Sequence, residues 1–291
     1  MRKNIFVGAM LVFATLSLSM SSCKGNNNES SVDKGEKPKK EKKVDMKDVF
    51  IYTLDHRHEK FQPTEKEKKM AIAKVLESVN EGEFKDNQDL EEVFFHKNIK
   101  HIVNGAFSGC KNIKALHFTN DVAVINDEAF MNCSSLENLK VDAWTIGLEC
   151  FKGCNSLKSA IFGEHLYWLR EGAFEGCKSL KTVIMPITVE KFEDPFKGCT
   201  AMQEFTVPNI AKNRLFGQLA ESQPNWRTIY LLSTEFFAMP KNCTPNEKAT
   251  LYVPDAFLAQ FQQDAEWSKF GKIEPLSKTK YYTAEGFWKT K

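Results

Sequence analysis

A short motif recurs five times along this 291-residue chain, and it constrains the fold more strongly than any other feature of the sequence. Each copy holds a Phe and, three residues later, a Cys. The Phe residues of successive copies lie 23, 21, 23 and 22 residues apart. Such a period predicts a solenoid, in which every repeat packs against its two neighbours. The copies are AFSGCKNI (106–113), AFMNCSSL (129–136), CFKGCNSL (150–157), AFEGCKSL (173–180) and PFKGCTAM (195–202).

Each copy leads into apolar residues whose spacing predicts two short strands per repeat. In Leu180-x-x-Val183-x-Met185 the last residues alternate as in a strand, and in Val122-x-x-Ile125 a second apolar pair precedes the next copy. Neither segment can bury its apolar side chains alone. We therefore expect the strands of successive repeats to pair in parallel around one continuous core.

The same spacing continues outside the five copies, so we expect eight strands of the first kind. The additional strands lie within 90–95, 226–231 and 251–253. A less regular connection, 208–225, carries a helical pattern.

The segment that precedes the repeats, 47–88, has a different pattern. It contains the strand-like sequence VFIYTL, and Thr64 and Glu67 have the spacing of a helix capping box. We interpret it as a small α/β cap that covers the N-terminal end of the solenoid. An independent small binding domain is the alternative. The expected helix would carry one apolar face, which consists of Ile72, Val75, Leu76 and Val79.

The repeated blocks, Pro186 and Pro208 at strand ends, and the sequence LYVPDAFLAQFQQDAEWSKFGKIEPL resemble the BspA-like leucine-rich repeat family. The resemblance implies a β-rich solenoid of short parallel strands stacked in a right-handed coil, closed by a C-terminal cap that contains a helix. It assigns residues 89–207 to regular repeats and 208–277 to divergent repeats and the C-terminal cap. Residues 278–291 remain as a tail.

Residues 1–22 have the features of a secretory signal peptide, namely a basic start, an apolar stretch over 5–20 and a small-residue end. The small residues directly before Cys23 resemble the cleavage site of bacterial lipoproteins. By that resemblance, Cys23 begins the mature chain and carries a diacylglycerol. Two or more acyl chains anchor a protein stably to a membrane. Cleavage as a plain secretory signal is the alternative.

The polar, Lys-rich segment 23–46 has no hydrophobic pattern, and we interpret it as a disordered tether. Removal of residues 1–22 would leave a formal net charge of zero, because Arg2 and Lys3 supply the excess of two positive charges. A neutral chain provides no electrostatic reason to expect nucleic-acid binding. The expected contact with the membrane is the lipid anchor.

Five of the eight Cys occupy the same position in successive repeats. Neighbouring strands are about 4.8 Å apart with parallel side chains, whereas a disulfide needs Cβ atoms about 3.8 Å apart that face each other. We therefore expect a column of buried thiols, with oxidation between neighbours as the alternative. A linear column cannot converge on zinc, and neither Cys150 nor Cys243 indicates chemistry. The column consists of Cys110, Cys133, Cys154, Cys177 and Cys199.

No motif in the sequence indicates an enzyme. A Gly-rich phosphate loop, GxSxG and HExxH are absent, although a pair of glycosidase carboxylates would leave no local signature. His56 and His58 could reach one metal from an extended chain, but no further ligand motif completes a site. We interpret their stretch, DHRHEK, as a solvated turn. The expectation is a non-catalytic protein with no metal and no cofactor.

One outward position per repeat provides a candidate binding surface. In each first strand, the residue between the last two apolar positions should point away from the core. Most of these residues are large and apolar or aromatic, a composition that marks binding surfaces. Cover by a cap, a loop or a second copy is the alternative. The outward row consists of Phe94, His117, Lys140, Ile161, Ile184, Thr206, Tyr230 and Tyr252.

Together these features predict a lipid-anchored, extracytoplasmic protein of the outer membrane or cell surface that binds a protein or glycan without chemistry. The family resemblance implies adhesion, through recognition of host matrix proteins or other bacteria. Capture of glycans or nutrients is an alternative, in which the aromatic residues act as a stacking platform. A periplasm-facing structural scaffold is another.

Overall fold

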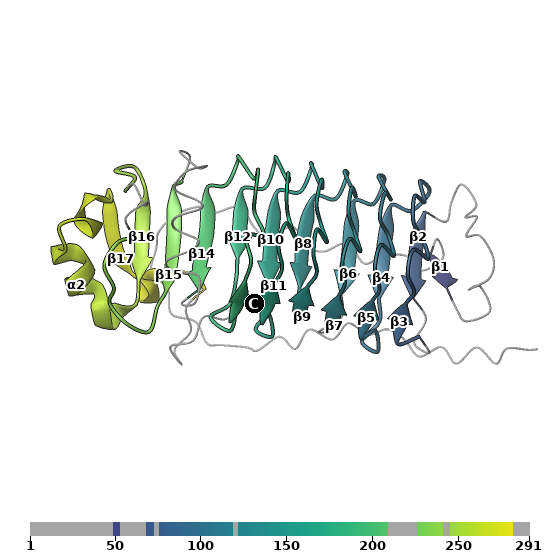
Figure 1. The fold of residues 1–291 in the computed structure, drawn as a ribbon, viewed down its shortest axis with the longest axis horizontal. Coiled ribbons are helices and arrows are strands. Elements are labelled where there is room, and N and C mark those ends of the chain that lie inside the picture. The colour runs from purple at the N-terminus through teal and green to yellow at the C-terminus, as the bar shows by residue number, and fades with distance from the viewer. Residues whose placement is uncertain are drawn as a thin grey trace, which may run out of the picture. The chain divides into compact units, whose positions relative to one another are not determined.

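Short parallel strands from successive repeats stack into two sheets (Figure 1). The computed structural model divides the chain into two units, 1–44 and 45–291. The expected signal peptide, Cys23, the tether, the DHRHEK stretch and Cys243 lie outside the residues that it describes, and so does the expected helix after Pro208. Of residues 49–52 only the backbone is described. The described residues are 49–52, 68–72, 76–118, 122–208, 226–240 and 245–281.

The larger sheet contains eleven strands, which follow one another in chain order and are all parallel. All eight expected strands are present, and β1, β2 and β17 extend the sheet at its two ends. The strands are β1 (Val49–Tyr52), β2 (Lys69–Ile72), β4 (Glu92–Phe95), β6 (Ala115–Phe118), β8 (Asn138–Val141), β10 (Ser159–Phe162), β12 (Thr182–Ile184), β14 (Glu204–Pro208), β15 (Thr228–Leu232), β16 (Thr250–Val253) and β17 (Lys272–Pro275).

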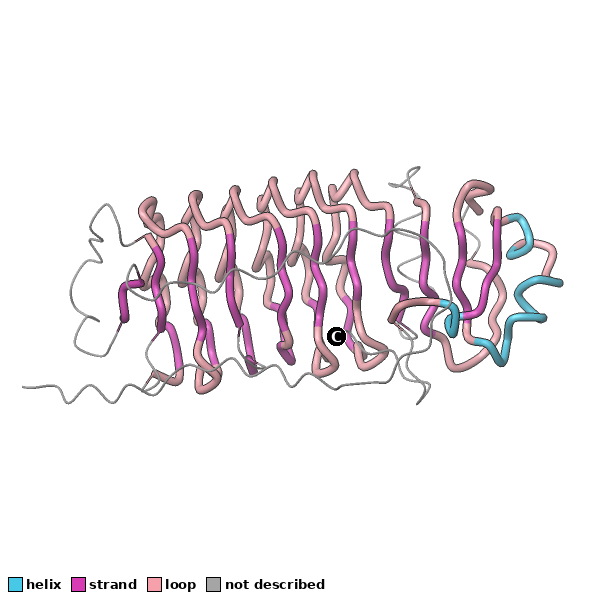
Figure 2. Tube along the Cα trace, turned by 180° about the vertical axis from the view of Figure 1, so that it is seen from behind, coloured by secondary structure: helices cyan, strands magenta, loops and turns pink. Residues whose placement is uncertain are grey.

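The smaller sheet contains six strands, also parallel and in chain order. Each follows a strand of the larger sheet along the chain, and loops of similar shape join them from one repeat to the next (Figure 2). The strands are β3 (Ser78–Val79), β5 (His101–Ile102), β7 (Val122–Ile125), β9 (Ala143–Ile146), β11 (Trp168–Leu169) and β13 (Lys191–Phe192).

The register of the larger sheet sets equivalent positions of the repeat opposite each other. Val93 lies opposite Leu116, and Ala160 lies opposite both Leu139 and Val183. All five side chains are buried. Because side chains alternate between the two faces of a strand, this register buries one apolar face completely.

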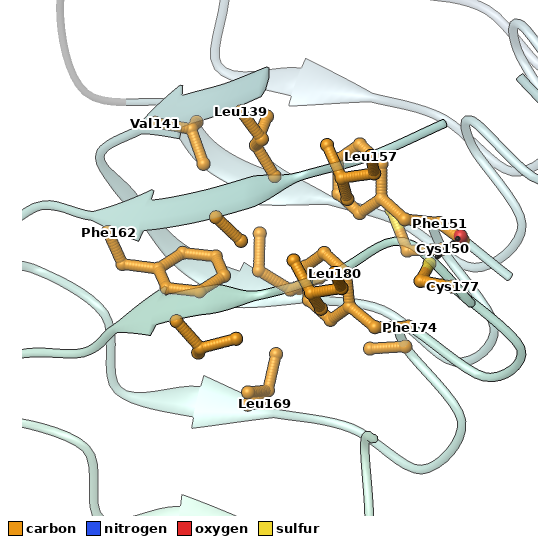
Figure 3. Packing of buried hydrophobic residues seen from close by; sticks show 14 of the residues in the cluster. Leu139, Val141, Cys150, Phe151, Leu157, Phe162, Leu169, Phe174, Cys177 and Leu180 are labelled. Atoms are coloured by element: carbon orange, nitrogen blue, oxygen red, sulfur yellow. Dashed lines mark hydrogen bonds between the residues drawn. The ribbon is translucent and has the colours of Figure 1, made fainter. Parts of the chain in front are cut away.

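A column of stacked phenylalanine rings runs through the core at the Ala-Phe position of the motif. The ring centroids of Phe107, Phe130, Phe151 and Phe174 follow one another at 5.2, 5.3 and 5.2 Å, and all four side chains are fully buried. Figure 3 shows two members, Phe151 and Phe174, beside leucines of the same repeats. The offset ring packing adds to the free energy gained by burial of apolar area.

The five column thiols lie at the equivalent place beside these rings, buried and free of disulfides. Each thiol donates a hydrogen bond to the carbonyl oxygen of the Phe in the preceding repeat. The Sγ of Cys154, for example, is 3.4 Å from the carbonyl oxygen of Phe130, and the Sγ of Cys177 is 3.2 Å from that of Phe151. Cys therefore fills a small apolar site and also supplies a weak donor to a buried carbonyl.

Each repeat also contains two backbone positions with positive φ, one directly before the Ala-Phe pair and one directly before the Cys. Gly usually occupies them, as at Gly109 (φ 76°) and Gly172 (φ 59°), because it has no Cβ to oppose this conformation. Three repeats instead place an acidic residue at the first position, Glu128 (φ 56°), Glu149 (φ 50°) and Asp194 (φ 42°). A side chain at this position carries a steric cost that Gly avoids.

We expect Glu128→Gly to raise the free energy of unfolding by about 0.5–1 kcal/mol, because relief of the left-handed strain exceeds the added entropy of the unfolded chain. The side chain of Glu128 is exposed, so little else changes. Chemical denaturation followed by circular dichroism measures the effect. The control Glu171→Gly, at an exposed residue outside the positive-φ positions, should have the opposite sign and lower the free energy of unfolding by a similar amount. A loss of stability in both variants would contradict the role of the positive φ at Glu128.

The C-terminal end of the solenoid is closed by a helical segment that buries Trp267. The indole Nε1 of Trp267 donates to the carbonyl oxygen of Phe237 at 2.9 Å, and the Phe261 ring packs edge-on at 5.3 Å. No helix in the described ranges is long and apolar enough to cross a membrane. The helices are the 3₁₀ helix Asp255–Phe257, α2 (Leu258–Gln263), and the 3₁₀ helices Trp267–Lys269 and Leu276–Lys278.

The expectation of a helix in the N-terminal segment is wrong for the described residues, which form strands. Lys69–Ile72 forms β2, which pairs with β4, and Ser78–Val79 forms β3, which pairs with β5. The apolar spacing fits a helical face, but it equally fits the strand pattern of the repeat, and pairing with the next repeat decides between them. Thr64, Glu67 and Val75 lie outside the described residues. The buried residues Met70, Ile72, Leu76 and Val79 stand 23 positions before Val93, Phe95, Ile99 and Ile102.

Candidate binding surfaces

The outward row of the larger sheet is aligned by the strand register. Phe94 lies opposite His117, and Tyr230 lies opposite both Thr206 and Tyr252. The buried apolar members belong to a cluster separate from the main core, which places them on the opposite side of the sheet. The row therefore lies on one face, but its two halves differ in accessibility.

The N-terminal half of the row is at least partly exposed. Phe94 and His117 stack with ring centroids 4.2 Å apart, and Lys140 is exposed. His117 Nε2 lies 3.0 Å from an oxygen of Glu92, whose other oxygen lies 3.0 Å from Lys69 Nζ. Burial of Glu92 acts to raise its pKa, but the hydrogen bonds from Lys69 and His117 outweigh it and lower that pKa. Ile161 is half-buried.

The C-terminal half is covered, which corrects the expectation of an accessible stripe. Ile184 and Thr206 are fully buried, and Tyr230 is 6% exposed. Leu276 belongs to the same buried cluster, and Tyr281 packs against it. Residues of the chain's own C-terminal segment thus pack against the cluster that contains Ile184 and Tyr230, which were expected to be accessible.

A second candidate surface lies on the smaller sheet and was not anticipated from the sequence. Strand β9 presents Trp144, and β11 with the residue before it presents Tyr167 and Trp168. Trp144 is 56% exposed, the highest value among the exposed large apolar side chains of the described residues. With Arg170 and Lys191 these three residues form the aromatic patch, a term used below for these five side chains.

Close contacts hold the aromatic patch together. The rings of Trp144 and Tyr167 meet edge-to-face at 5.7 Å, and Lys191 Nζ lies 4.6 Å from the centre of the Trp168 ring. The guanidinium of Arg170 lies 5.2 Å from the centre of the Trp168 ring, and its Nη1 donates to Asp127 Oδ1 at 2.6 Å. Cation–π contacts of this kind order long basic side chains beside an aromatic surface.

Two buried donors of the patch have no hydrogen-bond partner among the described residues. They are the Nε1 of Trp168 and the Nε of Arg170. Buried polar atoms are normally paired with protein groups or with ordered water.

The signal for the patch was present in the second apolar pattern of each repeat. In that pattern two residues stand between two buried ones, and both of them face outward, as the burial of β7 and β9 shows. The outward pairs of the six repeats are Glu77-Ser78, Lys100-His101, Ala123-Val124, Trp144-Thr145, Tyr167-Trp168 and Glu190-Lys191. Reading these pairs in order would have found the aromatic residues in adjacent repeats.

Neither a metal cluster nor a reactive thiol is found among the described residues. Within the described ranges, no group of three or more His, Cys, Asp or Glu could hold a metal ion. Burial raises the pKa of Cys110 to about 12 and places that of Cys133 well above its usual value. Such thiols remain protonated at neutral pH and are poor nucleophiles.

A family model described as "BspA type Leucine rich repeat region" matches residues 57–144 and 138–230, in six copies. The matched residues make up more than half of the chain. The search of curated proteins found no match.

Several solved structures are similar. A leucine-rich repeat protein from Bacteroides ovatus ATCC 8483 is 20% identical, with a TM-score of 0.45, over 64% of this chain and 51% of that one. This chain therefore spans about half the length of that relative. A leucine rich cell surface protein from Faecalibacterium prausnitzii A2-165 is 14% identical, with a TM-score of 0.37, over 76% and 81% of the two chains. The T. pallidum leucine rich repeat protein is 14% identical, with a TM-score of 0.34, over 67% and 81%.

Proposed function

The chain belongs to the BspA-type leucine-rich repeat family, and from this premise we propose that it is a lipid-anchored surface protein that recognises a protein ligand. Family membership supports a non-catalytic binding role for the solenoid. A rigid stack of repeats offers extended surfaces, and binding to them needs no chemical step. Adhesion to a matrix protein or to another cell is the form of recognition that we propose.

The aromatic patch is the observation that carries this proposal. Trp, Tyr and Arg are the residue types that dominate the binding energy of protein interfaces. Here they meet on adjacent repeats, with Trp144 largely exposed and Trp168 in cation–π contact with Arg170 and Lys191. An exposed aromatic cluster of this composition is typical of a site that buries against a partner.

The double variant Trp144→Ala/Tyr167→Ala tests the site. We expect it to weaken binding to immobilised matrix proteins, such as fibronectin and laminin, by at least about 30-fold, because loss of one interface hot spot costs about 2 kcal/mol. Surface plasmon resonance measures the affinity, and the thermal unfolding temperature should change little because both side chains are at least partly exposed.

The matched control is Phe94→Ala on the outward row of the larger sheet, where the aromatic side chain is half-buried. It should leave binding unchanged. Loss of binding in the control, with full binding by the double variant, would move the site to the larger sheet. Full binding by the folded double variant would refute the role of the patch.

Capture of a glycan is the second candidate, and the large exposed face of Trp144 favours it. A sugar ring stacks on such a face, and Arg170 and Lys191 stand close by for polar contacts. A glycan array with the same three proteins distinguishes the two candidates. Binding to glycans but to no matrix protein, lost with Trp144 and Tyr167, would replace protein recognition by glycan recognition.

Anchoring through Cys23 and exposure at the outer membrane or cell surface complete the proposal. They are supported by the lipoprotein-like sequence before Cys23 and by the family to which the repeats belong. Incorporation of a labelled fatty acid into the wild type, but not into Cys23→Ser, tests the anchor. Protease treatment of intact cells tests exposure, and full protection would favour the periplasm-facing scaffold instead of adhesion.

A further inference from the structure

The C-terminal half of the outward row forms a second apolar surface with an occupant from the same chain. Tyr230 and Tyr252 stack there with ring centroids 5.3 Å apart, beside the buried Leu232 and Ile184. These side chains lie outside the main core, so the sheet does not bury them by its own folding. An apolar and aromatic face of this kind would otherwise be exposed to water.

The occupant is the segment that follows β17. Leu276 is 6% exposed within the cluster, and the Tyr281 ring meets the Tyr230 ring edge-to-face at 5.5 Å. The segment turns back over the sheet by a single 3₁₀ turn, Leu276–Lys278, with Ser277 N donating to Asp255 Oδ1 at 3.1 Å. The segment therefore packs on the face of the larger sheet and does not add a strand to it.

Charge also matches the segment to this face. Two carboxylates flank the aromatic residues, Glu204 on β14 and Glu274 on β17, and Glu204 accepts a hydrogen bond from the Tyr230 hydroxyl at 2.7 Å. The segment carries Lys278, which pairs with Glu274, and Lys280, which lies over the Tyr281 ring at 4.9 Å. The hydrogen bond with Tyr281 is the largest of the effects that raise the pKa of Lys280, and the charge of Glu204 is the smallest.

We propose that this face of β12, β14, β15 and β16 is a docking site for a peptide that carries lysines and an aromatic residue, and that the chain's own residues 276–281 occupy it in cis. The contacts of Leu276 with the buried cluster and of Tyr281 with Tyr230 support this occupant. The surface is thus a masked binding site, distinct from the aromatic patch.

Removal of the occupant tests the proposal. The probe is a fluorescent synthetic peptide with the sequence of residues 276–291, and fluorescence anisotropy measures its binding to the full chain and to a variant that ends at Pro275. We expect the shortened variant to bind the peptide at least about 10-fold more tightly than the full chain, because its site is free. Tyr230→Ser in the shortened variant, and a peptide with Leu276→Ser and Tyr281→Ser, should each abolish the gain.

Three outcomes would overturn the proposal. One is a shortened variant that is folded by circular dichroism but binds the peptide no better than the full chain. Another is a gain that persists with Tyr230→Ser. The third is a full chain that forms a dimer by light scattering and separates into monomers on truncation, because a second copy would then be the occupant. If truncation prevents folding, the full chain with Leu276→Ser and Tyr281→Ser replaces the shortened variant and should show the same gain over wild type.

Discussion

Replacement of Phe130 by Ala is expected to lower the free energy of unfolding by about 3–5 kcal/mol. The Phe130 ring is fully buried and lies between the rings of Phe107 and Phe151, at 5.2 and 5.3 Å. Phe95 contacts it edge-on at 6.2 Å. The substitution leaves a cavity that cannot collapse easily, because the rings of Phe107 and Phe151 are held by their own neighbours in the column. Chemical denaturation followed by circular dichroism measures the loss.

The matched control removes a side chain of the same type, Phe94, from the outward face of the larger sheet. Phe94→Ala should cost less than about 1 kcal/mol, because Phe94 is only half-buried and contacts a partly exposed His117. In a repeat protein the Phe130 substitution should also broaden or split the transition, since repeats are stabilised through contacts with their neighbours. Similar losses in the two variants would show that the phenylalanine column is not the main source of stability.

The second large effect concerns the thiols, which should be almost unreactive in the folded protein. We expect the described cysteines to react with a disulfide reagent at pH 8 at least about 1,000-fold more slowly than in guanidinium chloride, because reaction requires unfolding. All six are buried. Burial raises the pKa of Cys110 to about 12, and the pKa of Cys154 lies well above its usual value, so the thiolate is scarce at this pH.

The measurement uses the full chain with Cys23→Ser and Cys243→Ser, so that only the six described thiols remain. Absorbance of the released reagent should report no fast phase in buffer and six equivalents in denaturant. Fast reaction of one thiol in the folded protein would contradict a purely structural column and would mark that Cys as a candidate nucleophile. Fewer than six equivalents in denaturant would indicate oxidation between repeats.

The repeats themselves could be predicted because each residue's main partner lies one period away in the sequence. Phe107 and Phe130 stack, and Val93 pairs with Leu116, at a separation of 23 residues in both cases. A shared period therefore determines strand order and register together. The same period predicts strands in place of the expected N-terminal helix, since Ile72 and Val79 stand 23 residues before Phe95 and Ile102. The local spacing of the apolar residues fits a helix as well, and by itself it favoured the wrong structure.

The repeat period was sufficient to predict the parallel strands, their register and the column of buried thiols. Which outward faces are free became known from the folded structure alone. Tyr230 is covered by Tyr281, a contact that follows no period, whereas Trp144 and Tyr167 remain at the surface. The physical reason is that a repeat specifies its neighbours through spacing, but the cover of a finished face depends on non-repeating contacts between distant segments.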